Sequence, residues 1–324
     1  MKLKNKKIKF KKKYFNFYIK CMILSADLLI ILFLINFTKD INILQLKKIK
    51  VCICTIGKLE NNYINEFVEY YYNYGVDKIF LYDNNDINDE YFETKISYYI
   101  NNKFVQVLNY RGQKKKQYKI YQKCYENNSR IFDWLIFYDI DEFINLKNYR
   151  NIKRFLINKK FDKCQSIYLN WVLHTDNGLL YYDNRTLHKR FTEIKTDKNY
   201  CLGKTIIRGN IKKIKMNSCH LLDRKIKRCN GFGKIFKSLG IFCIVPDYKD
   251  YYIDHYQFKS TEELINKLNK GDCLYGDNNK YKYKKILSYF SFNKITLDKI
   301  NLIENRTGLN ISKLKMNFTY STYL

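Results

Sequence analysis

The sequence predicts an α/β fold in which a mostly parallel central sheet carries helices on both faces. Short apolar runs of strand length alternate with segments of helical spacing from residue 51 onward. One of these runs, residues 134–138 (WLIFY), is apolar throughout, as in a parallel strand buried on both faces. Of the 324 residues, 46% are hydrophobic and 17% are aromatic, so the chain can bury a sizeable core. One proline and twelve glycines exclude a collagen-like or linker-dominated chain.

The first β-α-β unit lies directly after residue 50. Residues 51–56 (VCICTI) form an apolar run of strand length. Residues 62–74 place apolar side chains at helical spacing, and Gly75 then ends the predicted helix. Those apolar side chains are Ile64, Phe67, Val68, Tyr71 and Tyr72. Residues 78–82 (KIFLY) form the second strand, which a polar turn closes.

The same alternation continues over the next sixty residues. We expect a helix at 90–101, a strand at 105–109, a helix at 116–127 and the buried strand at 134–138. Ligands of such sheets bind beyond the carboxyl ends of the strands. Residues that follow an apolar strand are therefore the first candidates for function.

The later half is less regular. Its predicted elements are strands at 166–171, 204–208, 220–222 and 251–254 and a helix at 261–268, which Ser260 or Thr261 would cap. Beyond residue 280 we expect helices that pack on the edge of the domain.

The N-terminus combines a basic run with the most apolar stretch of the chain. Residues 1–20 form a basic tail, residues 21–37 are apolar, and residues 38–50 would be a short stem. Positive charges before an apolar segment are typical of a signal anchor. The segment is short for a membrane span and contains Asp27, so an amphipathic or core-packing helix on a membrane surface remains an alternative.

The formal charge of +29 raises the question of nucleic-acid binding. Most of the basic residues are lysines spread along the chain, whereas arginine, which base and phosphate readout prefers, is scarce. We therefore expect no nucleic-acid partner. The lysines at 114–116 could neutralise an anionic ligand, although a solvated surface is the simpler interpretation.

The ten cysteines show no zinc-ligand spacing and no pattern of disulfides. Cys52 and Cys54 alternate with apolar residues in the first strand, where a thiol acts as a small hydrophobe. We expect free structural thiols.

The sharpest chemical signal is Asp139-Ile140-Asp141-Glu142, directly after the buried strand. In an extended conformation Asp139 and Asp141 project to the same side, so both carboxylates can reach one divalent cation. Buried carboxylates need a metal or hydrogen-bond donors to compensate their charge. The motif therefore predicts a metal site that holds a diphosphate, with a pair of solvated turn acids as the alternative.

An ordered set of segments resembles glycosyltransferase family 92 and its family 2-like relatives, which have a GT-A fold. The set runs from residue 51 to about residue 271. Its segments are VCICT with Lys58 and Glu60, EFVEYYYNYGVDKIFLYDNND, Gln117 ahead of Tyr121, DWLIFYDIDEFI, and Asp254-His255-Tyr256 with Lys259-Ser260. The resemblance implies a GT-A catalytic domain over 51–275, followed by a helical and basic extension over 276–324.

The resemblance also implies a ligand set. Asp139 and Asp141 match the family's D-x-D motif, which holds Mn²⁺ or Mg²⁺ against the two phosphates of a nucleotide sugar. His255 matches the histidine that completes the metal shell. Seven further positions match residues that contact the nucleoside, line the donor pocket or face the departing diphosphate. They are Cys54, Thr55, Glu60, Asp83, Gln117, Lys204 and Lys259.

The catalytic base is where the chain departs from the family. Around Trp171 the family has a glycine-containing stretch that this sequence lacks. Inverting transfer needs a carboxylate that takes the proton of the acceptor hydroxyl. Asp176 is the first candidate for this base, and Glu193 is the second.

The resemblance implies a metal-dependent enzyme that transfers a hexose from a UDP-linked or similar donor to a glycan or other hydroxyl acceptor, with inversion. The alternatives are a basic nucleic-acid- or membrane-surface-binding protein and an inactive transferase fold that acts as a binding module. We expect membrane association, single-pass at a Golgi-type or other internal membrane, with a soluble cytoplasmic form as the other option.

Overall fold

The computed structural model describes most of the chain from residue 49 onward. The described residues are 31, 49–113, 117–196, 202–216, 220, 226–236, 248–271 and 278–311. The chain divides into two compact units, Met1–Ile49 and Lys50–Leu324, and nearly all described residues belong to the second. The predicted tail (1–20) and anchor (21–37) lie outside the described residues, apart from Ile31. The helices in the described ranges include none with the length and apolar character that crossing a membrane requires.

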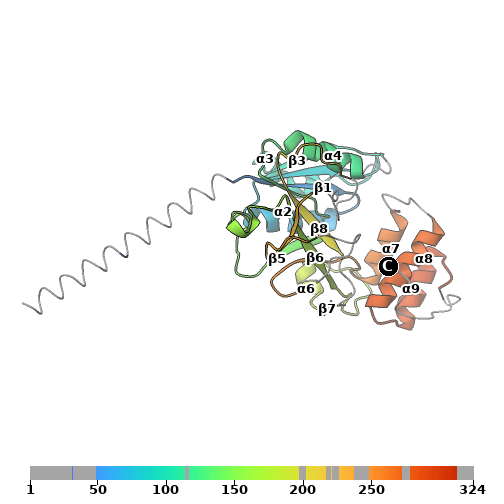
Figure 1. The fold of residues 1–324 in the computed structure, drawn as a ribbon. Coiled ribbons are helices and arrows are strands. Elements are labelled where there is room, and N and C mark those ends of the chain that lie inside the picture. Colours follow the sequence, from blue (N-terminus) through green and yellow to red (C-terminus); the bar gives the residue numbers. More distant parts are fainter. Residues whose placement is uncertain are drawn as a thin grey trace, which may run out of the picture. The chain divides into compact units, whose positions relative to one another are not determined.

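A single mixed sheet forms the centre of the Lys50–Leu324 unit (Figure 1). Its strands are β1 (Val51–Gly57), β2 (Lys78–Asp83), β3 (Val105–Asn109), β4 (Trp134–Ile136), β5 (Glu142–Leu146), β6 (Ser166–His174), β7 (Ile194–Lys195), β8 (Gly203–Arg208), β9 (Arg228–Asn230) and β10 (Tyr251–His255). The order is β3-β2-β1-β4-β8-β6-β10-β5, and β7 and β9 also pair with β6. Strands β1 to β4 pair in parallel, whereas β8 and β5 run antiparallel to their neighbours.

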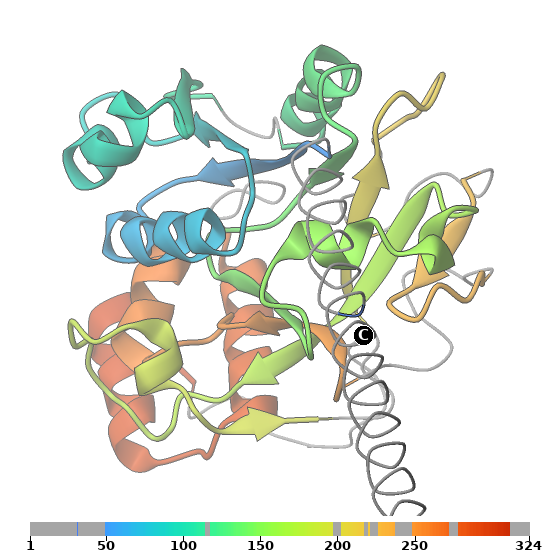
Figure 2. The ribbon, with the colours of Figure 1, turned by 90° about the vertical axis from the view of Figure 1, so that its left-hand side faces the viewer.

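Helices flank this sheet. They are α2 (Asn61–Asn73), α3 (Glu93–Asn101), α4 (Gln117–Asn128), α5 (Ile152–Leu156), α6 (Leu187–Arg190), α7 (Thr261–Asn269), α8 (Asn279–Phe292) and α9 (Leu297–Thr307), with a short 3-10 helix at Lys159–Phe161. Helices α2 and α4 lie on opposite sides of β1 (Figure 2). The predicted α/β class, with a mostly parallel sheet between helices, is therefore confirmed.

The β-α repeats of the first half lie close to their predicted bounds. Strand β3 has the predicted bounds, and α2 ends before Gly75, whose φ of +86° is readily adopted by glycine. The prediction was wrong at Tyr72, which is 45% exposed instead of facing the core. One apolar cluster joins α4 to β1 and β4. It includes Cys52, Cys54, Ile120, Tyr121, Cys124, Leu135 and Phe137.

The region after β4 differs most from the prediction. The ladder of β4 ends at Ile136, although Phe137 and Tyr138 remain fully buried. Residues 140 and 141 form a turn instead of the extended segment that we expected for the acids, and strand β5 then begins at Glu142 and pairs antiparallel with β10. This pairing between segments about a hundred residues apart is invisible in a local pattern, because it depends on long-range register.

The C-terminal helices pack together on one side of the domain (Figure 1). Ser260 caps α7 in a complete capping box with Glu263, so the predicted cap is confirmed. Helices α8 and α9 are the helices that we expected beyond residue 280. Of the strand predicted at 220–222, only His220 is described.

The expectation of free thiols was wrong for four cysteines. Disulfides join Cys54 to Cys124 and Cys164 to Cys229, while Cys52 is free and buried. The partners are 70 and 65 residues apart in sequence, so no local spacing could reveal them.

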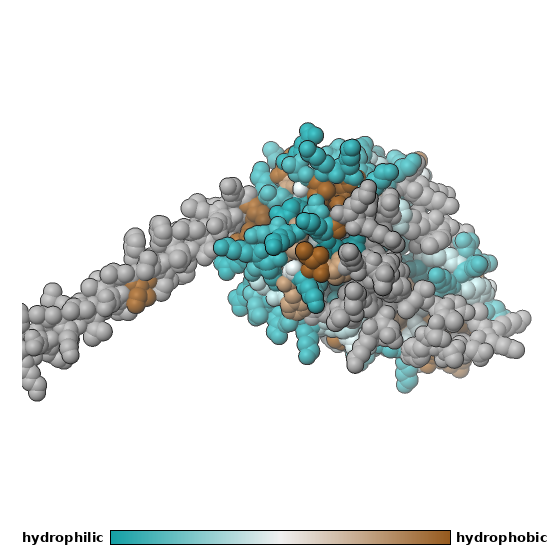
Figure 3. Space-filling model, viewed as in Figure 1, coloured by the Kyte–Doolittle hydropathy of each residue, from teal (hydrophilic) through white to brown (hydrophobic). Residues whose placement is uncertain are grey.

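The described surface is mostly hydrophilic on the side shown in Figure 3, with small apolar patches between polar side chains. Apolar side chains at the surface are therefore scattered, as is normal for a folded domain.

Candidate functional site

The register of four neighbouring strands builds one wall of the candidate site. On one face of the sheet β8 contributes Lys204, β6 Trp171, β10 His255 and β5 Glu142. The Trp171 and His255 rings lie 4.3 Å apart between centroids. Asp139 follows β4 at the same end of the sheet. Polar side chains from distant parts of the sequence thus meet where the carboxyl ends of the parallel strands lie.

Asp139 is held by one charged and one neutral donor. Lys204 Nζ donates to Asp139 Oδ2 at 2.7 Å, and the Tyr121 hydroxyl on α4 donates to Oδ1 at 3.3 Å. Burial acts to raise the pKa of Asp139, but the Lys204 ammonium outweighs it, and the pKa lies below the ordinary value. Asp139 is therefore a carboxylate at neutral pH.

Glu142 lies beneath Asp139 and is wholly buried. Its Oε2 accepts the Asp139 backbone N–H at 3.0 Å, and its Oε1 lies 3.3 Å from Lys204 Nζ. Burial raises the pKa of Glu142 well above the ordinary value. The Lys204 ammonium acts to lower this pKa, whereas the charges of Asp139 and Asp141 raise it further. Glu142 thus fixes both the Asp139 backbone and the Lys204 ammonium.

Asp141 lies between an imidazole and two ammonium groups. His255 Nε2 is 3.6 Å from Asp141 Oδ1, while Lys259 Nζ and Lys267 Nζ lie 3.1 and 3.5 Å from Oδ2. Burial opposes ionisation of Asp141, but Lys259 and then Lys267 outweigh it and hold its pKa well below the ordinary value. Burial lowers the pKa of His255 to about 4 against the attraction of Asp141, so the imidazole is neutral at pH 7.

A row of lysines lines the α7 side of the site. Lys259 precedes α7 and its ammonium lies 4.4 Å from the centre of the Tyr63 ring. Lys267 and Lys270 are three residues apart on α7 and therefore share a face of the helix. Lys270 Nζ is ion-paired with Glu60, the residue that precedes α2. Three ammonium groups thus face the two carboxylates of Asp141 and Glu60, which leaves positive charge for an anionic ligand.

Two of the side chains lie at a separation that suits one divalent cation. Two atoms that bind one ion at about 2.1 Å stand roughly 3 to 3.6 Å apart, the separation of Asp141 Oδ1 and His255 Nε2. The neutral imidazole is also the form that binds metals. Asp139, in contrast, is turned to Lys204. Within the described ranges, no three His, Cys, Asp or Glu side chains gather closely enough to hold a metal ion. The pair Asp141 and His255 therefore fits a cation, and Asp139 would have to leave Lys204 to join them.

Comparison with known proteins places the chain in a family. A family model described as glycosyltransferase family 92 matches residues 47–272, which is more than half of the chain. The chain belongs to glycosyltransferase family 92. The predicted family, a family of glycosyltransferases, is thereby confirmed.

Individual relatives are distant. A glycosyltransferase family 92 protein of Ricinus communis is 29% identical over 104 residues, which cover 32% of this chain and 18% of that protein. Among solved structures, S. aureus TarS matches with a TM-score of 0.36 and 14% identity over 80% of this chain and 48% of that chain. A fragment of S. aureus TarS in complex with UDP-GlcNAc matches with a TM-score of 0.36 and 13% identity over 80% of each chain.

Asp83 of this family 92 chain is bound within the protein. It is 2% exposed. Its Oδ1 accepts a hydrogen bond from Asn85 Nδ2 at 2.7 Å, and its Oδ2 forms an ion pair with Arg111 Nη1 at 2.6 Å. Arg111 also donates to four backbone carbonyls of the loop after β2 and lies 4.0 Å from the Tyr91 ring centre. The predicted nucleoside contact of Asp83 is therefore indirect at most in this arrangement, because its carboxylate shapes the loop.

The remaining donor candidates differ in their exposure to ligand. The Cys54 side chain is wholly buried in its disulfide, and the place of this residue beside the nucleoside stays a prediction. Thr55 follows it and has a buried hydroxyl without a hydrogen-bond partner. Gln117 is the first residue of α4 and is half-buried. Among the residues predicted to contact the sugar donor, Lys204 forms an ion pair with Asp139 and Lys259 forms one with Asp141.

The hydrogen bonds of the two expected catalytic bases, Asp176 and Glu193, do not involve Asp139, Asp141 or His255. Asp176 is 2% exposed, and its Oδ2 accepts Lys299 Nζ and the Tyr289 hydroxyl, so it joins the end of β6 to α8 and α9. In this arrangement the Asp176 carboxylate is occupied by Lys299 and Tyr289, and its role as the catalytic base stays a prediction. Glu193 is exposed, and its side chain contacts Thr175.

Sequence reasoning missed the roles of several residues that build the site. Glu142 was part of the quoted motif, but only the pairing of β5 with β10 shows that it faces His255. Arg111 is the second residue after β3, at the end of the sheet where ligands bind, and this position was the available signal. Lys267 and Lys270 carried no signal, because a lysine on a helix is usually solvated.

Proposed function

We propose that the chain is a metal-dependent hexosyltransferase that uses a nucleoside diphosphate sugar, UDP-linked by family resemblance, and a hydroxyl acceptor such as a glycan, with inversion. The observation that carries the proposal is the Asp141–His255 pair, 3.6 Å apart, at the end of the sheet where Lys259 and Lys267 contact Asp141 and Lys204 holds Asp139. Acids with an imidazole suit a divalent cation, and surplus lysines suit phosphate oxygens.

The chain's own residues would divide the work as follows. Asp141 and His255 would hold Mn²⁺ or Mg²⁺, with Asp139 as the further ligand. When bound, the cation would offset the charge that develops on the leaving diphosphate. Lys259 and Lys267 lie within 3.5 Å of Asp141 Oδ2, from where they can contact phosphate oxygens and stabilise the same charge.

The proposal extends to the place of action. The described part of the domain contains two disulfides, and such bonds form and persist in oxidising compartments. This supports a domain that works inside a Golgi-type or other internal membrane system. The anchor at 21–37 remains part of that proposal.

The direct test incubates the full chain with a panel of nucleotide sugars and acceptors, with Mn²⁺ or with EDTA, and follows release of the nucleoside diphosphate. We expect release in the presence of Mn²⁺ but not of EDTA. The rate should fall by roughly a hundredfold or more in Asp141→Asn, because that variant weakens binding of the ion and alters the charge balance around it. Asp250→Asn is the matched control, since Asp250 pairs with Lys147 at the surface, away from the site. Equal rates in EDTA, or in both variants, would count against a metal-dependent transferase.

A further inference from the structure

The buried disulfide Cys54–Cys124 lies directly behind the candidate site. Cys54 is in β1 and Cys124 is in α4, and both are wholly buried in the apolar cluster between these two elements. Strand β1 pairs with β4, the strand that leads to Asp139. The bridge therefore joins the helix on one face of the sheet to the strand beside the acid motif.

Helix α4 also touches the acid motif itself. Tyr121 precedes Cys124 by three residues, so the two side chains lie on one face of the helix. The Tyr121 hydroxyl donates to Asp139 Oδ1, and the Tyr121 ring packs 5.3 Å from the Phe137 ring in the segment before Asp139. A small shift of α4 along β1 would move this hydroxyl away from the carboxylate.

We infer that the Cys54–Cys124 bridge is a positioning element of the donor site: it holds α4 on β1 so that Tyr121 keeps its hydrogen bond to Asp139 Oδ1 when Asp139 Oδ2 leaves Lys204 for the cation. The inference rests on the proposed function. It makes binding of the metal–nucleotide pair depend on this bridge, since a hydrogen bond to a charged group is lost if α4 moves. Cys54 and Tyr121 act through Asp139 and are not catalytic residues.

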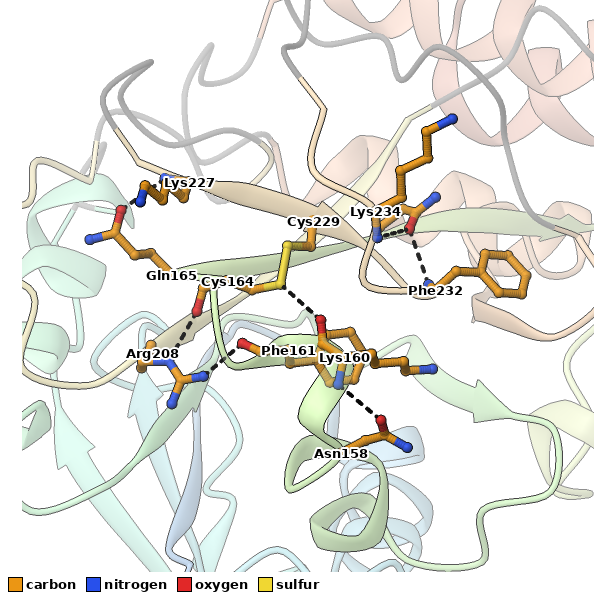
Figure 4. Close-up of a disulfide and its surroundings, with 11 residues drawn as sticks. Asn158, Lys160, Phe161, Cys164, Gln165, Arg208, Lys227, Cys229, Phe232 and Lys234 are labelled. Atoms are coloured by element: carbon orange, nitrogen blue, oxygen red, sulfur yellow. Dashed lines mark hydrogen bonds between the residues drawn. A yellow bond between two sulfur atoms is a disulfide. The ribbon is translucent and has the colours of Figure 1, made fainter.

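The second disulfide provides a matched control. Cys164–Cys229 joins the segment before β6 to β9, beside Arg208 and Lys160 (Figure 4). It closes a segment of 65 residues against 70 for Cys54–Cys124, so the two bridges constrain the unfolded chain almost equally. Removal of either bridge should lower the melting temperature by a similar amount, whereas only one of them lies behind the acid motif.

The first experiment compares the double variants Cys54→Ala with Cys124→Ala and Cys164→Ala with Cys229→Ala in the full chain. UDP and Mn²⁺ binding are measured by calorimetry at a temperature where both variants are folded. We expect the Cys54/Cys124 variant to lose about tenfold in UDP affinity and to need a higher Mn²⁺ concentration for half-saturation. The Cys164/Cys229 variant should stay within about twofold of the original chain. Equal losses in the two variants would overturn the inference.

A second pair of variants decides the matter if a cysteine variant does not fold. Tyr121→Phe keeps the bridge and removes the hydroxyl that faces Asp139. Tyr125→Phe removes the hydroxyl one turn later on α4, which bonds to Arg208 and Ile211 instead. We expect the Mn²⁺ midpoint for UDP binding to rise about tenfold in Tyr121→Phe and to stay unchanged in Tyr125→Phe. Identical midpoints would refute the positioning role.

The two levels of the proposal can fail separately. If the original chain binds neither UDP nor Mn²⁺, the proposed function fails. If it binds both and the Cys54/Cys124 and Tyr121 variants bind as well as their controls, only the positioning role fails.

Discussion

Asp176 shows how burial decides the role of an acid. In the sequence it is one carboxylate in a polar loop after an apolar strand, which is where a catalytic base would lie. In the structure Lys299, Tyr289 and the Gly178 backbone N–H surround its two oxygens. Its role is to anchor the C-terminal helices to the sheet, and the expected phenotype of a substitution changes accordingly.

Asp176→Asn should therefore reduce stability more than transfer rate. The substitution leaves the Lys299 ammonium, which is 1% exposed, without a compensating charge. We expect the free energy of unfolding to fall by about 3 to 5 kcal/mol, the usual loss when a buried ion pair loses one partner. Urea denaturation measures this, with Asp250→Asn at the surface as the control that should lose less than about 1 kcal/mol. A variant that unfolds like the original chain but transfers no sugar would restore Asp176 as a candidate base.

The acids of the site could be predicted from the sequence, but their partners could not. Asp139, Asp141 and His255 were identified from a motif and a resemblance, and Asp141 and His255 do lie 3.6 Å apart. The lysines that neutralise them come from β8, from the segment before α7 and from α7 itself. Their role depends on which way a long side chain points, and local sequence does not specify that.

At the scale of elements, α7 is the part that fixes the lysine side of the site. Glu263, which forms the capping box of α7 with Ser260, accepts two hydrogen bonds from Arg190, at 2.8 and 2.9 Å, and one from the Tyr63 hydroxyl at 2.6 Å. These bonds tie α7 to α6 and α2. Glu263 and Lys267 belong to the same short helix. The anchorage of Glu263 therefore also fixes the orientation of Lys267 toward Asp141.

The anchorage of α7 predicts a pH dependence. Burial acts to raise the pKa of Glu263, but hydrogen bonds from Arg190, Ser260 and Tyr63 outweigh it and hold the pKa below its ordinary value. A depressed carboxyl pKa contributes stability that is present above the unfolded value of about 4.3 and is lost as the pH falls through the folded value. The free energy of unfolding of the original chain should therefore fall as the pH drops below about 5.

Glu263→Gln should show less of this acid loss, because it has already lost the ionised partner of Arg190 at neutral pH. We expect it to be about 3 kcal/mol less stable at pH 7, with a flatter profile below pH 5. Glu126→Gln, on the exposed face of α4, is the control and should follow the original chain. Urea titrations at several pH values measure both effects, and parallel profiles for all three proteins would contradict the assignment.

At the scale of the whole molecule, the two disulfides tie together segments that are far apart in the sequence. Each bridge closes a segment of 65 to 70 residues, so its removal should lower the free energy of unfolding by about 4 kcal/mol in the chain-entropy description. Thermal scans of the purified chain with and without dithiothreitol measure the effect. A count of free thiols in each sample shows whether the bridges are reduced or intact. Coincident transitions in the reduced and oxidised chain would show that the bridges do not constrain the unfolded state.

The sequence predicted β1 to β4, β6, β8 and β10 near their observed bounds, although β8 runs antiparallel to both neighbours, and it missed β5, β7 and β9. Strands β1 to β4 belong to β-α repeats, in which each strand is followed by a helix of regular spacing. Strands β5, β7 and β9 are short and pair with strands far away in the sequence. Nothing local distinguishes such strands from loops, because their pairing depends on contacts that form only in the complete fold.

Strand β10 carries a different kind of side chain on each of its faces. His255 looks toward Asp141, while its neighbour Asp254 looks the opposite way and accepts a hydrogen bond from His174 at 2.7 Å. Adding or deleting one residue within this strand would exchange the two faces and present a carboxylate where an imidazole is needed. Length variation among relatives should consequently be absent from this stretch and concentrate in the connections that precede it.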